Sequence, residues 1–167
     1  GDNSRGQLGR DSSQSTDPTP SLVPTVAHLR FLAVAIGQDH LCGLTLNRTI
    51  EGWGSNAQGQ LGRPSSEMGS SHEPVTVDVP GHLIPEAISV GFGHSCALVD
   101  EGSIWCWGEN SHGQLGRGYD SSWEPVGQVL LPAGDVSVQV SSGYDSSCAR
   151  LESGELWCWG ANNYQQL

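Results

Sequence analysis

The feature that most constrains this chain is a motif that recurs four times in its 167 residues. The motif reads Gly-x-Asn, two variable residues and Gly-Gln-Leu-Gly, with a shortened last copy, and it begins at Gly1, Gly54, Gly108 and Gly160. The intervals of 53, 54 and 52 residues indicate a repeat architecture, so the fold has to be inferred one repeat at a time. The pattern divides the chain into repeats 1–53, 54–107 and 108–159, and residues 160–167 begin a fourth repeat equivalent to 1–8.

Two further motifs keep the same interval. A Gly-x-x-His-x-Cys segment occupies residues 37–42 and 91–96, and the third copy, at 143–148, has Ser146 in place of the histidine. A tryptophan precedes a glycine near the end of each repeat, at Trp53, Trp107 and Trp159. Agreement at so many offsets indicates three tandem repeats.

Each repeat is predicted to consist of short β-strands. Apolar segments at 95–99 and 103–107 flank an acidic, glycine-containing turn at 100–102, which is the pattern of a β-hairpin. An earlier strand is expected at 86–90, with counterparts in the other repeats. A repeat of about 50 residues with several strands matches one blade of a β-propeller, so we expect an all-β chain of four-stranded blades.

The motifs together resemble the repeat of the regulator of chromosome condensation family. The resemblance covers the whole chain, with the Gly-Gln-Leu-Gly segment followed by Pro-Val, Gly-x-x-His-x-Cys-Ala-Leu, an acidic turn and Trp-Gly. It departs from the pattern at Ser146 and at Gln165, which replaces a motif glycine. The resemblance implies a β-propeller, and members usually close a ring of six or seven blades.

Three blades are too few to close such a ring, and an open array leaves strand edges unpaired. One expectation is that other copies of the chain complete the propeller, as a ring or a head-to-tail filament. The alternative is that the chain is a fragment of a longer propeller.

The five cysteines predict two disulfides. Cys96 and Cys106, and likewise Cys148 and Cys158, lie ten residues apart across a predicted hairpin, where cross-strand side chains are close enough to bond. Cys42 is expected to be a free thiol because Gly52 occupies the partner position. Disulfides favour an extracellular, secreted location. Buried free thiols in a cytosolic protein are the alternative, and the spacing does not favour a zinc site.

Asn47 agrees with a secreted location. Residues 47–49 read Asn-Arg-Thr, an acceptor for N-linked glycosylation, and repeat alignment places Asn47 at the tip of a hairpin turn. We therefore predict a glycan at Asn47.

The charge balance excludes some classes of partner. The chain has 18 acidic and 7 basic residues, a net charge of −11. Phosphate recognition needs a concentrated cationic surface, so we expect no nucleic-acid binding. The apolar segments are too short to span a bilayer, so no membrane insertion is expected.

No combination of residues suggests catalysis. His40 and His94 recur one repeat apart, and the interpretation we favour is a structural histidine that bonds the backbone. We expect no enzyme activity, no metal and no cofactor. Partner-binding candidates are sought instead in the variable loops 11–21, 64–72 and 118–123, and they are His72, Tyr119 and Trp123, the last as an exposed aromatic anchor in a loop.

Three functions compete. The first is a secreted structural scaffold in which neighbouring chains complete the repeats. The second is a protein-binding propeller that presents variable loops to a partner or inhibits an enzyme. The third, which the acidic charge disfavours, is a nucleotide-exchange regulator like the founding member of the family.

Overall fold

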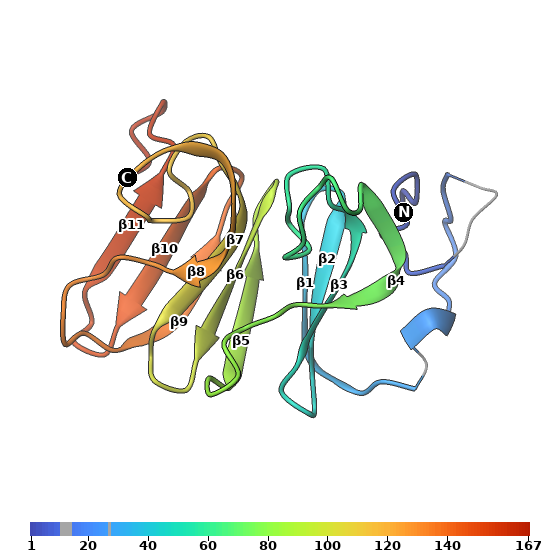
Figure 1. The fold of residues 1–167 in the computed structure, drawn as a ribbon, viewed down its shortest axis with the longest axis horizontal. Helices are drawn as coiled ribbons and strands as arrows, with labels where there is room; N and C mark the ends of the chain where they lie inside the picture. The colour runs from blue at the N-terminus through green and yellow to red at the C-terminus, as the bar shows by residue number, and fades with distance from the viewer. Residues whose placement is uncertain (11–14, 27) are drawn as a thin grey trace.

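The computed structural model describes residues 1–10, 15–26 and 28–167. These residues form three antiparallel sheets that stand side by side (Figure 1). The prediction of an all-β chain built from propeller blades is confirmed, and each sheet is called a blade below. Residues 11–14 of the loop expected at 11–21 lie outside the described residues.

The strands follow one another in chain order within each blade. Blade one contains β1 (Phe31–Ile36), β2 (His40–Thr45), β3 (Ile50–Ser55) and β4 (Ser70–Thr76). Blade two contains β5 (Pro85–Val90), β6 (His94–Val99), β7 (Ile104–Asn110) and β8 (Ser121–Gln128). Blade three contains β9 (Ser137–Ser142), β10 (Ser146–Leu151) and β11 (Leu156–Gly160). A short 3-10 helix, η1 (Pro24–Val26), precedes blade one.

Blade three differs from the expected four strands. In blades one and two the fourth strand, β4 or β8, follows a loop that contains the Gly-Gln-Leu-Gly motif. Residues 160–167 correspond to that loop in blade three. Within the described part of the chain, the outer edge of β11 therefore has no partner strand.

The first glycine of the repeated motif has a backbone conformation that favours glycine. Gly54, Gly108 and Gly160 have φ values of +105°, +102° and +109°. At Gly54 a Cβ atom would lie only 2.4 Å from the carbonyl oxygen of Asp39. The chain turns from the third strand into the loop at this position, and only glycine adopts that turn without strain.

The apolar core lies between neighbouring blades. One cluster packs Leu44 and Ile50 of blade one with Trp107 of blade two. A second packs Leu115, in the loop after β7, with Ala149 of blade three. Burial of a leucine or isoleucine side chain contributes about 1.5–3 kcal/mol, so each blade is stabilised by a core that it shares with the next.

The segment 16–23 starts with the same kind of backbone bridge as the fourth strand of a blade, although it belongs to none of the three sheets. Asp2 pairs with Thr16 in an isolated antiparallel bridge. Ser55 makes the equivalent pair with Ser70 at the start of β4. The N-terminal segment therefore takes the position of an outer strand in front of blade one.

Candidate functional site

Two disulfides cross the hairpins of blades two and three. Cys96 bonds to Cys106 and Cys148 bonds to Cys158, with Cα–Cα distances of 4.1 and 4.0 Å. Both pairs join residues that are directly opposite in the strand register. The two predicted disulfides are thus present in the structure.

Cys42 is free, and its surroundings make it unreactive. Its register partner in β3 is Gly52, which offers no second sulfur. Burial raises the pKa of the Cys42 thiol to about 12, and the sulfur lies 3.7 Å from the hydroxyl of Ser95. Nucleophilic chemistry needs the thiolate, so Cys42 acts here as a packing residue.

Asn47 lies in the exposed turn between β2 and β3. The next residue, Arg48, has a φ of +62°, which helps to reverse the chain there. The side chain of Asn47 is accessible from solvent, and its glycosylation stays a prediction.

A chain of buried hydrogen bonds connects blade one to blade two. The Nε2 atom of His40 lies 3.0 Å from the hydroxyl of Ser95, and that hydroxyl donates to the carbonyl oxygen of Gln60 at 3.0 Å. The indole of Trp107 donates to the same carbonyl at 2.9 Å. The histidine was expected to bond the backbone directly. It bonds a serine of the next blade instead, because the Gly-x-x-His segment faces the neighbouring sheet.

An equivalent chain connects blade two to blade three. His94 Nε2 lies 2.8 Å from the hydroxyl of Ser147, which donates to Gln114 at 3.2 Å, and Trp159 donates to the same carbonyl at 2.9 Å. Burial lowers the pKa of His40 to about 3 and that of His94 to about 4. Both rings are therefore neutral near pH 7, and they hold blades together.

The two outer blades each lack one half of this hydrogen-bond chain. Blade one has Leu41 at the position that Ser95 and Ser147 occupy. Blade three has Ser146 at the position of the two histidines. Among the described blades, the complete hydrogen-bond chain therefore occurs at the junctions of blade one with blade two and of blade two with blade three.

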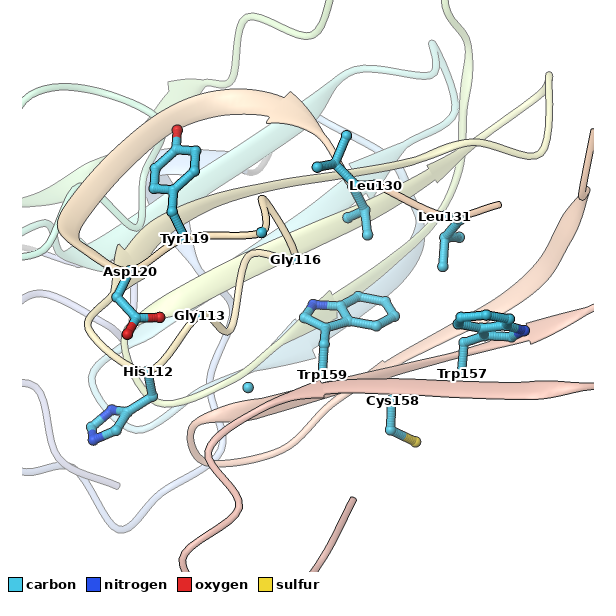
Figure 2. A pocket seen from close by; sticks show the side chains of 13 residues that line it. His112, Gly113, Gly116, Tyr119, Asp120, Leu130, Leu131, Trp157, Cys158 and Trp159 are labelled. Atoms are coloured by element: carbon cyan, nitrogen blue, oxygen red, sulfur yellow. The ribbon is translucent and has the colours of Figure 1, made fainter. Parts of the chain in front are cut away.

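The open edge of β11 borders an apolar groove with a volume of about 470 Å³. Trp157 and Trp159 project from β11 into this groove, and Cys158 points away from it (Figure 2). Leu130 and Leu131, which follow β8, face the two indoles from the opposite side (Figure 2). Leu130 is 71% exposed and Trp157 is 41% exposed, so the groove is open to solvent.

The equivalent space one blade earlier is filled by side chains of β8. A Cβ atom on Gly59 would lie 2.9 Å from the ring of Trp123, and one on Gly62 would lie 3.7 Å from Val126. Two side chains of β8 thus cover two glycines of the preceding Gly-Gln-Leu-Gly loop. The equivalent glycines of the next loop, Gly113 and Gly116, line the groove.

The structure separates the three predicted partner-binding residues. Tyr119 is 53% exposed and lines the groove. Trp123 was expected in a loop as an exposed anchor, but it lies in β8 and is half-buried because its ring packs on Gly59. His72 lies in β4, also half-buried, and packs against Gly6. Partner binding by these residues stays a prediction.

A small group of polar side chains lies near one end of the groove. His112, which lines the groove, has its Nδ1 atom 3.8 Å from the carboxylate of Asp145. Burial and the nearby Glu109 raise the pKa of Asp145, whereas His112 opposes that shift. The groove thus combines an apolar floor with a polar end.

The described residues contain no group of three or more histidine, cysteine and acidic side chains placed to hold a metal ion. None of the helices in the described part of the chain is long and apolar enough to cross a membrane.

Comparison with known proteins identifies the repeat. Two family models of the regulator of chromosome condensation (RCC1) repeat match the chain. One matches residues 1–44, 52–98 and 101–150, and the other matches residues 31–60, 86–114 and 138–166.

Three known proteins illustrate the similarity. The chain is 32% identical over 138 residues to the human probable E3 ubiquitin-protein ligase HERC6, covering 82% of this chain and 13% of that protein. The crystal structure of human WBSCR16 matches with a TM-score of 0.84 and 30% identity, over 100% of this chain and 43% of that one. The structure of Prp20p from Saccharomyces cerevisiae has the same TM-score at 22% identity, over 100% and 41% of the two chains.

Proposed function

Because this chain belongs to the RCC1 repeat family, we propose that it is a non-enzymatic protein-binding module that presents its variable loops to a protein partner. The observation that carries the proposal is Tyr119, which is 53% exposed in the loop between β7 and β8, beside the 71% exposed Leu130. Exposed aromatic and apolar side chains are the groups that commonly anchor a protein partner. Yeast Prp20p, which shares the fold, was analysed for binding to Gsp1p and histones, and this supports a role in protein binding.

We further propose that the protein is secreted. Two disulfides stabilise blades two and three, and disulfides persist in oxidising compartments. The exposed acceptor at Asn47 supports the same location.

A photocrosslinking experiment tests protein binding at the groove. In the full-length secreted protein, a benzoyl-phenylalanine replaces Tyr119, and in a control protein it replaces Leu46, a 58% exposed residue in the turn between β2 and β3. We expect discrete protein adducts from position 119 that disappear with Leu130→Glu. No adduct at position 119, or the same adducts at position 46, would contradict the proposal.

Self-assembly into a scaffold is a second candidate, favoured by the outer-strand position of residues 16–23. In this arrangement, neighbouring copies of the chain complete one another's repeats. Sedimentation velocity of the disulfide-intact chain at micromolar concentrations tests it. Dimers or longer series that dissociate with Leu130→Glu would support the scaffold, and a monomer at all concentrations would exclude it.

A further inference from the structure

We infer that a polar pocket between β4 and the N-terminal loop, residues 1–10, binds a phosphate or sulfate group. The pocket has a volume of about 180 Å³ and is lined by residues of the segments 3–10 and 70–72. A single water molecule needs about 10–15 Å³ of cavity, so the pocket has room for a tetrahedral oxyanion and several waters. This site is separate from Tyr119 and does not depend on the proposed protein-binding function.

Both walls of the pocket belong to the repeat pattern. The N-terminal loop lies beside β4, and a Cβ atom on Gly6 would lie 2.9 Å from the Cα atom of His72 (Figure 1). The same junction occurs one repeat later, where the loop 54–63 packs against β8 and Gly59 meets Trp123. The pocket is therefore formed at a blade junction that has a counterpart within the same chain.

Two positions of the pocket differ from that counterpart. Arg5 carries a positive charge where the later junction has the neutral Gln58. His72 has a smaller ring than Trp123, its counterpart in β8. The indole of Trp123 covers the glycine of its loop, whereas the imidazole of His72 lines a pocket. One difference therefore adds charge to this junction and the other adds space.

Arg5 is the cation that would hold the anion. Its side chain is exposed and has no ion-pair partner among the described residues. Arg10 also lines the pocket, but its guanidinium lies 2.7 Å from the carboxylate of Asp17, which offsets its charge. The carboxylate of Asp2 accepts hydrogen bonds from the N–H and the hydroxyl of Ser4. Guanidinium groups bind oxyanions through paired N–H donors, and those of Arg5 are available.

The rest of the lining is polar as well. Asn3 is fixed in place, because its Nδ2 atom donates to the carbonyl of Arg10 and its Oδ1 atom accepts from the N–H of Leu8. Ser70 and Ser71 bring hydroxyl groups from β4. None of the described residues that line the pocket has an apolar side chain. Such a lining favours a hydrated anion over an apolar ligand.

The charge of the whole chain restricts the ligand to a single anionic group. With a net charge of −11, the chain repels a polyanion such as a nucleic acid along most of its length. A lone phosphate or sulfate group is affected mainly by the charges close to it, because salt screens exposed charges beyond about 10 Å at 0.1 M ionic strength. The group can therefore be a free ion or one ester on a larger molecule.

Binding is tested on the full, disulfide-intact chain at constant ionic strength. Phosphate, sulfate, phenyl phosphate and phenyl sulfate replace chloride stepwise, and amide chemical shifts are followed by NMR. We expect saturable shifts concentrated at residues 3–10 and 70–72. Tighter binding of the phenyl esters would identify an ester as the source of the group, and equal binding would identify the free ion. Both results support the site.

Three variants localise the binding. Arg5→Gln introduces the residue of the later junction and should weaken binding at least about tenfold, because a charge-assisted hydrogen bond is lost. Arg5 is exposed, so this change removes no core packing. His72→Trp introduces the residue of β8 and should fill the pocket, with a similar loss. Arg150→Gln removes an exposed arginine of blade three and should leave binding unchanged.

The variants also decide against the inference if it is wrong. Weaker binding with Arg5→Gln and His72→Trp, but not with Arg150→Gln, supports an oxyanion site in this pocket. Equal weakening with Arg150→Gln would overturn it, because the attraction would then be a general effect of surface arginines. The absence of saturable shifts with all four ligands would overturn it too. Neither result changes the expected crosslinks from position 119, which lies in blade two.

Discussion

At the scale of single residues, Cys42 and Gly52 show how one substitution changes a repeat. They face each other in β2 and β3 as the two disulfide pairs do in the other hairpins. A glycine at the second position leaves the sulfur of Cys42 buried and free. The backbone of blade one is therefore already arranged for a third disulfide.

Gly52→Cys should form that bond. A Cβ atom at residue 52 would lie 3.7 Å from the sulfur of Cys42 and 3.1 Å from Leu61, so a small shift of Leu61 accommodates it. Closing so short a loop should raise the free energy of unfolding by about 2–3 kcal/mol. Thiol titration under denaturing conditions and urea unfolding measure the two effects. Gly52→Ala is the control, and equal stability of the two variants would contradict the prediction.

His40 and His94 should make stability fall in acid. The pKa of each is lowered in the folded state, to about 3 and about 4, so between those values and about 6.5 the unfolded chain binds more protons. Stability from these groups is complete above pH 6.5 and is lost as the pH falls. The expected loss between pH 6.5 and 5 is up to about 2 kcal/mol per histidine.

Urea unfolding at pH 7, 6 and 5 checks this dependence. In a protein with His40→Gln and His94→Gln the loss over this range should be clearly smaller than in the unaltered chain. An identical pH dependence of the two proteins would show that the histidines do not cause it.

At the scale of elements, the blades are joined by hydrogen bonds between side chains on strands of neighbouring blades. β6 supplies Ser95 and β10 supplies Ser147, each to a histidine of the preceding blade. These hydroxyls also donate to backbone carbonyls of the preceding loop. Each serine thus satisfies two buried groups at once, and its removal leaves a buried histidine nitrogen without a partner.

Ser95→Ala should lower the free energy of unfolding by about 1–3 kcal/mol, the cost of an unsatisfied buried polar group. Ser146→Ala is the matched control, since Ser146 occupies the histidine position of blade three and has no described blade beyond it. We expect its effect to stay within about 0.5 kcal/mol. Similar losses for both variants in urea unfolding would argue against a specific role of the bonds between blades.

At the scale of the whole molecule, the features that support secretion lie in different blades. The disulfides belong to blades two and three, and the glycan acceptor belongs to blade one. All three are compatible with passage through a secretory pathway. Tyr119 and Leu130, at which we place a protein partner, line the groove between blades two and three.

The chain secreted from eukaryotic cells should have a peptide mass four hydrogens below that of the reduced form, because it contains two disulfides. It should also carry one N-linked glycan that enzymatic deglycosylation removes and that Asn47→Gln abolishes. Intact mass spectrometry before and after both treatments measures this. Five free thiols in the native protein would refute a secreted, disulfide-bonded form.

The sequence pattern within each repeat was sufficient to predict much of the fold. The hairpins of blades two and three, and the cysteines opposite each other in them, follow from apolar segments around a short turn. The partner of His40 was not predictable in the same way, because Ser95 is 55 residues away in the next blade. The burial of Trp123 was missed as well, since the glycine that its ring covers belongs to the preceding loop.

The sequence by itself determined the repeat, the all-β blades and the disulfide pairs, because each depends on residues that are close along the chain. Only the tertiary structure decided how neighbouring blades pack and which side chains meet between them. The groove beside β11 arises where Gly113 and Gly116 meet Trp157 and Trp159, which come from different blades. Such a surface depends on how one sheet packs on the next, and periodicity within a single repeat contains no information about that packing.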